Sequence, residues 1–256
     1  VDKKGLVKIN SPLNFPEKAL SDFVTNKKSW ILKTIQKQKE KQKIEKSHQE
    51  YLEKNQEIYI LGKKYKIVIS KNSSFDTEIT RKSLIKLLNL ENFYLENFYL
   101  ENFSLDFKKQ QIKLSQYFLN CSYKSELKLF LKKILKIHLQ LSIENYLKQL
   151  KIKQELQLKI KDYKSKWGSC HFYQSNFNIP FIKKPLLRKI GLYFNFNLVF
   201  FEKEIINYVV AHETCHILEP NHSKKFWLKL KSIYSDYVFV KQWFKTEPAK
   251  YIYPFY

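Results

Sequence analysis

The chain has 256 residues, of which 44% are hydrophobic and 16% aromatic, so it can form a buried core in one large domain or two smaller ones. Its formal charge of +23 favours acidic partners such as nucleic acid, yet Arg81 and Arg188 are the only arginines among the 47 basic residues. Arginine is the residue best suited to phosphate and base recognition. We therefore interpret the lysines mainly as a solvated surface and keep nucleic acid as a second candidate partner.

Cysteine usage and hydropathy bear on the compartment. Cys121, Cys170 and Cys215 form no C-x-x-C pair, which argues against a disulfide framework and fits a reducing compartment. No stretch approaches the roughly 18 apolar residues of a membrane-spanning helix, and no basic-then-apolar signal opens the sequence. We therefore expect a cytoplasmic protein that does not enter a membrane.

The first half of the chain combines helix and strand patterns. A helix is predicted through Phe23 and Trp30, and the polar run from Lys37 to Lys54 after it is interpreted as a solvated helix or linker. Residues 58–69 alternate between apolar and polar around a Gly-Lys pair, which indicates a β-hairpin. Residues 84–107 contain a five-residue LENFY near-repeat, which we interpret as an insertion that lengthens a β segment.

The second half predicts an α+β unit. Residues 123–150 have the spacing of an amphipathic helix, in which His138 is interpreted as a core or boundary histidine rather than a metal ligand. Strands are expected at 156–163 and 192–201, and the aromatic C-terminal tail is expected to pack on the core. We predict an N-terminal β-containing region over 1–120 and a catalytic domain over 121–256.

Residues 208–227, YVVAHETCHILEPNHSKKFW, hold three of the six histidines. His212 and His216 are four residues apart, so a helix places both rings on one face, where neutral imidazoles can share a zinc ion. His222 can supply a third ligand. Glu213 follows the first histidine and can take a proton from a water on the metal without ligating it.

A turn is expected between the second and third histidines, because Pro220 cannot continue the helix. Either Asn221 or Ser223 can then cap a second helix with Phe226 and Trp227 on its apolar side. Cys215 lies within the motif, but its helical position directs it away from the histidines, so we interpret it as a small buried residue.

These motifs resemble a known family. The run Lys166-Trp167-Gly168-Ser169-Cys170, the strand with Asn195 and the block from Tyr208 to Trp227 are similar to the YgjP-like branch of the zincin metallopeptidases, which is related to the SprT-like zinc metalloproteases. The segments NSP, KSWI and YILGKKYKI extend the resemblance over most of the chain.

The sequence departs from the family pattern at a few positions. Lys166 replaces an arginine, Thr214 a leucine and Asn197 a basic residue, and about a dozen residues are added after Cys170. None of these changes removes a predicted ligand or the glutamate. Glu219 stands where a metzincin has glycine, which argues against that branch.

The resemblance implies zinc-dependent hydrolysis of a peptide bond in a protein or peptide substrate, with His212, His216 and His222 as ligands and Glu213 as general base. It also implies a substrate-pairing strand beside the metal helix, for which residues 191–200 are the candidate, and Trp167 is expected to pack under the site. Two alternatives stay open: a zinc-binding, nucleic-acid-associated protein with little or no general protease activity, and a zinc-stabilised scaffold without catalysis. The oligomeric state is left open.

Overall fold

The computed structural model describes residues 6–12, 15–71, 103–106, 109–116, 123–173, 189–248, 251–252 and 255. Most of the LENFY repeat and residues 174–188 of the added loop lie outside these ranges, and the interpretation of the repeat as an insertion stays a prediction. The chain divides into two compact units, Val1–Tyr51 and Leu52–Tyr256. The domain boundary predicted at residue 120 likewise stays a prediction.

The first unit consists mainly of helix α1 (Glu17–Lys54), which runs to the start of the second unit. The polar run after Leu32 is therefore helix rather than linker, because its Lys, Gln and Glu residues favour helix and neither Gly nor Pro interrupts them. Side chains one turn apart support it, at 3.2 Å between Gln36 Nε2 and Glu40 Oε1 and 3.9 Å between Lys46 and Glu50.

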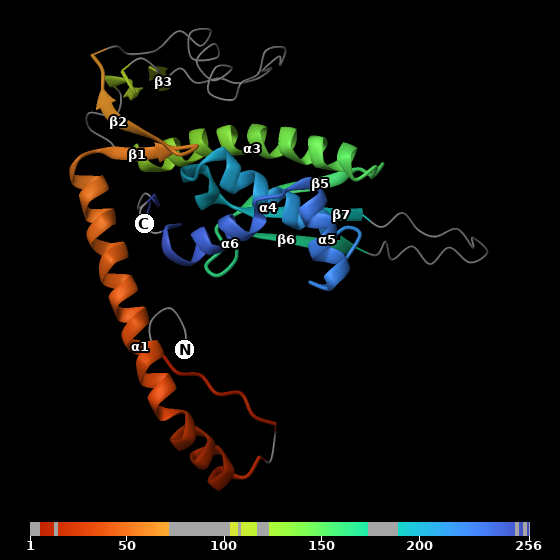
Figure 1. The fold of residues 1–256 in the computed structure, drawn as a ribbon. Helices are drawn as coiled ribbons and strands as arrows, with labels where there is room; N and C mark the ends of the chain where they lie inside the picture. Colours follow the sequence, from red (N-terminus) through yellow and green to blue (C-terminus); the bar gives the residue numbers. More distant parts are fainter. Residues whose placement is uncertain are drawn as a thin grey trace, which may run out of the picture. The chain divides into compact units, whose positions relative to one another are not determined.

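A four-stranded sheet begins the second unit, in the order β1-β2-β4-β3 (Figure 1). Strands β1 (Glu57–Ile60) and β2 (Lys63–Ile69) form the predicted hairpin, with Gly62 at φ 79° in the turn. Strands β3 (Phe103–Asp106) and β4 (Gln111–Leu114) complete the sheet. Strand β3 falls within the 84–107 segment that was interpreted as β, whereas β4 was not predicted.

A three-stranded sheet carries one wall of the candidate site. Strands β5 (Leu156–Lys161), β6 (Gly168–Tyr173) and β7 (Lys189–Asn195) lie in the order β5-β7-β6. Central β7 is parallel to β5 and antiparallel to β6. The prediction of one strand over 192–201 was wrong in its second half, since residues Phe196–Phe200 form the 3-10 helix η2. An almost unbroken apolar run has no period that separates a buried strand from a buried helical turn.

The described part of the unit also contains the helices α3 (Lys124–Gln149), α4 (Lys203–Cys215), α5 (Lys224–Ile233) and α6 (Tyr237–Thr246). Helix α3 packs against α4 and η2, and their apolar side chains join those of both sheets in one core. His138 is buried in this core, where its Nε2 lies 3.0 Å from Asn207 Oδ1, so the interpretation as a core histidine was correct.

The C-terminal tail packs on this core as expected, with the Tyr251 ring 4.8 Å from that of Tyr59 and Phe255 5.6 Å from Phe196. The mixed α+β class is confirmed. Among the described residues, no helix is both long and apolar enough to cross a membrane.

Candidate metal centre

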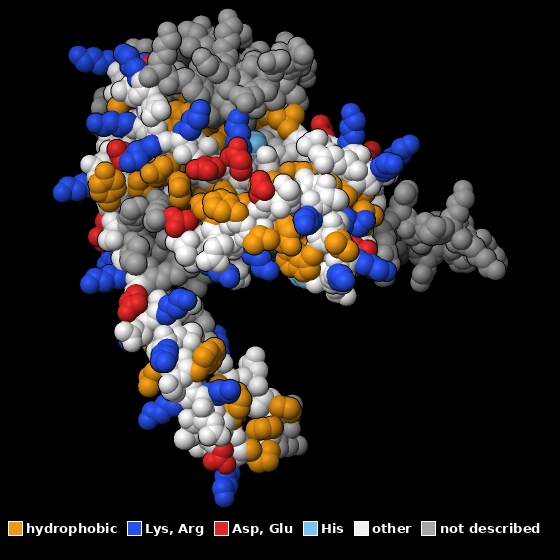
Figure 2. All heavy atoms as spheres, viewed as in Figure 1, with side chains coloured by type: hydrophobic (Ala, Val, Ile, Leu, Met, Phe, Trp, Pro, Cys, Tyr) orange, Lys and Arg blue, Asp and Glu red, His pale blue; other side chains and the backbone are white. Residues whose placement is uncertain are grey.

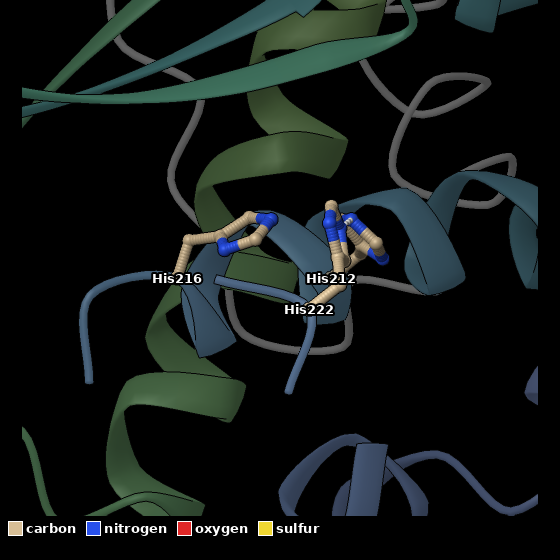
Figure 3. Close-up of side chains that lie close together, drawn as sticks. All are labelled: His212, His216 and His222. Atoms are coloured by element: carbon tan, nitrogen blue, oxygen red, sulfur yellow. Dashed lines mark hydrogen bonds between the residues drawn. The ribbon is translucent and has the colours of Figure 1, made fainter. Parts of the chain in front are cut away.

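Helix α4 and the segment after it bring three histidines together. His212 lies in the last turn of α4, His216 caps its C-terminus, and His222 follows the turn. One ring nitrogen from each falls within 4.8 Å of the others. The ring centroids are 4.6–4.9 Å apart, and Figure 3 shows the rings directed toward one another.

The turn that returns His222 is built locally. The N–H of Glu219 donates to the carbonyl of Cys215 at 3.0 Å, and Pro220 then prevents further helix. The Ser223 hydroxyl accepts from the N–H of Phe226 at 3.3 Å, so of the two predicted caps of α5, Ser223 is the one used. The Phe226 ring, fully buried, supports all three imidazoles at centroid distances of 4.6–4.9 Å.

The imidazoles have the character of metal ligands. Burial, and then the neighbouring histidines, lowers the pKa of His212 to about 3, and burial also lowers the pKa of His216. Both rings are therefore neutral at pH 7, which is the form that binds metal. His216 Nδ1 lies 3.0 Å from the Glu219 carbonyl, a contact that fixes its tautomer and leaves Nε2 for a ligand.

Hydrogen bonds do not satisfy all the ring nitrogens of the three described histidines. His212 Nε2 and His222 Nε2 are 2.8 Å apart, so either one ring donates its N–H to the other or a cation lies between the two nitrogens. The other nitrogen of His212, Nδ1, is buried without a hydrogen-bond partner. A divalent cation between the rings would take up the converging nitrogens, so the residues present fit a metal ion.

The Glu213 side chain extends from α4 toward β6. Its side chain is buried, and this burial raises its pKa to about 7, opposed by Lys166 and by the N–H of Cys170, which donates to the carboxylate. Gly168 of β6 makes the position possible, because a Cβ there would lie 2.6 Å from Glu213 Cγ. A carboxyl group with a pKa near 7 is suited to exchange protons at neutral pH.

A cleft of about 660 Å³ opens at the histidines and Glu213. Strand β6 and the residues before it form one wall, and α4, α6 and the turn form the other. Its lining residues are Lys166, Trp167, Gly168, Ser169, Cys170, Phe172, Tyr208, Val209, His212, Glu213, His216, Pro220, His222, Lys241 and Phe244. Trp167 also packs 5.0 Å from Phe201, in agreement with its predicted place under the site.

Two other residues of the motif point into the core. Thr214 is fully buried and its hydroxyl donates to the Val210 carbonyl at 2.7 Å, so this departure from the family pattern lies away from the cleft. Cys215 is fully buried as predicted. Burial raises the pKa of its thiol to about 12.

The candidate for the substrate-pairing strand requires correction. Strand β7, within the predicted range 191–200, is paired on one side with β5 and on the other with β6, so it has no free edge for a peptide. In the described part of the chain, β5 and β6 are the two edge strands of this sheet, and of these two β6 lines the cleft. The apolar pattern of β7 signalled burial, which a central strand has and an edge strand lacks.

Sequence reasoning missed three contributors to the site. Gly168 was noted only within a motif, Lys241 of α6 was not singled out, and Phe226 was assigned only to a helix face. Nothing local in the sequence signals that Gly168 faces Glu213, because 45 positions separate them along the chain.

The architecture defines an α+β protein with a three-histidine site beside a buried glutamate and an edge strand. The chain belongs to the YgjP-like family, since the family model described as YgjP-like, metallopeptidase domain matches residues 1–247. No curated protein and no solved structure matches it significantly. Membership in a metallopeptidase family implies a protein substrate.

Proposed function

We propose that the chain is a zinc metallopeptidase in which His212, His216 and His222 hold the metal and Glu213 is the general base. The observation that carries the proposal is the convergence of three imidazoles beside a buried carboxyl group in one cleft. A zinc ion held there would supply Lewis acidity toward a peptide carbonyl and lower the pKa of a water molecule. Three histidine nitrogens are a donor set typical of catalytic zinc.

The chain's own residues would do the remaining work. Strand β6 would pair with an extended peptide through its free edge, which places a backbone carbonyl alongside the cleft. Glu213 would accept a proton at its carboxylate and return it to the departing amine. The N–H of Cys170 and the space at Gly168 hold the carboxylate in place for both transfers.

The test compares wild type with Glu213→Gln and His212→Ala for zinc content, thermal midpoint and cleavage of casein. Glu213→Gln preserves size but cannot accept a proton, so cleavage should fall by about 10²–10⁴-fold while zinc is retained. His212→Ala should lose zinc and activity together, and its thermal midpoint should no longer rise when zinc is added.

The alternatives predict different results. Zinc retained by wild type with no cleavage of any unfolded substrate, and no effect of Glu213→Gln, would favour a zinc-binding protein with little or no general protease activity. Absence of zinc in protein purified without chelator, or undiminished zinc in His216→Ala, would contradict the metal site itself.

A further inference from the structure

The β5-β7-β6 sheet has a second face, opposite the core. Leu158, Leu192 and Phe194 point to the core side, and strand alternation assigns the neighbouring positions to the other side. The residues of this outer face are Gln157, Lys159 and Lys161 of β5, Ser169, His171 and Tyr173 of β6, and Lys189, Gly191, Tyr193 and Asn195 of β7. No side chain among these described positions is acidic.

Aromatic rings form the centre of this outer face. The His171 ring lies 4.7 Å from Tyr193 and 6.3 Å from Tyr173, and the two tyrosine hydroxyls are hydrogen-bonded to each other. Gly191 has no side chain, so these rings fill the space above it: a Cβ there would lie 2.9 Å from the Tyr193 ring. Tyr173 remains 40% exposed, which leaves an aromatic surface available for stacking.

Lysines surround the rings. The ammonium groups of Lys161 and Lys159 lie 4.3 Å and 5.4 Å from the centre of the Tyr193 ring, and Lys166 lies 4.6 Å from that of Tyr163. The nearest carboxylate after β5, Asp162, is paired with Lys128 and Lys132 of α3, at 3.0 and 3.7 Å. The positive charge of the outer face is therefore not neutralised from that side.

The positive charge of the lysines also acts on His171. Its pKa is lowered first by burial and then by Lys166 and Lys161. Lysines are common elsewhere on this protein and are scattered over the face shown in Figure 2, so charge alone does not locate a partner. The combination of lysines with neighbouring aromatic rings on one face of a sheet distinguishes the outer face.

We propose that the outer face of the β5-β7-β6 sheet binds single-stranded nucleic acid, with bases stacked on Tyr173 and His171 and phosphates on Lys159, Lys161 and Lys189. Sheets bind single strands in this way because each base offers a π-face to an aromatic ring while lysines neutralise the backbone. Tyr173, His171 and the three lysines are not among the residues that line the cleft, so this binding does not depend on peptidase activity.

The experiment measures fluorescence anisotropy of a labelled oligonucleotide of about 15 nucleotides with the full chain, as DNA and as RNA, over a range of salt concentrations. Lys159→Gln/Lys161→Gln should weaken binding and reduce the slope of log K against log[salt] by about 1.4, since each phosphate contact with a single strand contributes about 0.7. The matched control is Lys224→Gln/Lys225→Gln, which removes two exposed lysines from α5. It should leave the slope nearly unchanged.

The stacking part is tested separately. Tyr173→Ala should weaken binding by about five-fold or more without changing the salt slope, whereas Tyr173→Phe, which keeps the ring, should bind like wild type. Thermal midpoints establish that each variant is folded. An equal loss of affinity in the α5 control, an unchanged Tyr173→Ala, or equal competition by a poly-glutamate peptide would each overturn the proposal.

Discussion

Gly168 of β6 faces Glu213 of α4 so closely that a Cβ at the glycine would lie 2.7 Å from Oε1 and 2.6 Å from Cγ of the glutamate. The proposed base is thus positioned by the absence of a side chain on the strand across the cleft. The closeness makes the two residues energetically dependent on one another, which can be measured.

Gly168→Ala should displace the Glu213 carboxyl, lower peptidase activity at least ten-fold and cost about 1–3 kcal/mol of stability through overpacking. Zinc content should stay at the wild-type level, because no ligand is touched. A double-mutant cycle supplies the control: in a Glu213→Ala background, the stability cost of Gly168→Ala should largely disappear. If the stability costs of Gly168→Ala and Glu213→Ala simply add, the alanine side chain is accommodated by a change that does not involve Glu213.

Asn195 holds the segment before β6. Its Nδ2 donates to the carbonyls of Tyr163 and Lys166, both at 2.9 Å, and its Oδ1 accepts from the N–H of Asn197 at 3.0 Å. Because the side chain is buried, Asn195→Ala should cost roughly 2–4 kcal/mol in urea unfolding, since carbonyls lose their donors. Asn197→Ala is the matched control, as it keeps the backbone N–H, and should be nearly neutral. Similar costs in both would contradict the positioning role.

His138 predicts how stability depends on pH. Burial, and secondarily Lys203, lowers its pKa from 6.5 to about 4 in the folded state. Between these values the unfolded chain binds more protons than the folded one, so this contribution to stability is full above pH 6.5 and lost as the pH falls toward 4.

The loss of folding stability is about 1.4 kcal/mol per pH unit between the two pKa values of His138. Between pH 6.5 and 4.5, wild type should lose roughly 2 kcal/mol more than His138→Gln, whose amide can still donate to Asn207 but does not titrate. Denaturant unfolding at the two pH values measures the difference. Parallel losses in the two proteins would mean that His138 is not held neutral.

Lys241 predicts a substrate preference. Lys166 and Lys241 line the cleft, and Glu213 carries the one carboxylate among the described lining residues. Lys241→Glu should therefore lower kcat/KM for a peptide with glutamate near the scissile bond relative to its glutamine counterpart, by about two- to five-fold, as expected for a solvent-exposed charge. Lys245→Glu, one turn further along α6 and outside the lining, is the control. Equal ratios in both variants would exclude a specific role for Lys241.

Different parts of the site were predictable to different extents. The gathering of His212, His216 and His222 followed from sequence because helix spacing and Pro220 are local features. The position of β6 at the edge of its sheet could not be predicted from the sequence, because hydrophobic patterns indicate burial and not which strand lies beside another. The same limit explains the error over η2, where buried residues follow one another without a period.

The N-terminal half shows a similar contrast. The β1-β2 hairpin was predicted from alternation around Gly62, whereas β4, which was not predicted, pairs with β2, far away in sequence, as well as with β3. Long-range pairing leaves little trace in a four-residue strand. The continuous α1 was underestimated because a polar run carries no apolar stripe, although its helix propensity is high.

The three histidines fall within one short segment, while Gly168 and the β6 edge come from much earlier in the chain. Closing a short loop costs little entropy, so the proposed ion site requires only α4, its turn and the start of α5 with Phe226, whereas alignment of the proposed base also requires the sheet. Damage to the sheet, by mutation or partial unfolding, would therefore yield a metal-loaded but inert protein before it yields a metal-free one. Metal content would then be a poor proxy for the fraction of competent molecules in any preparation.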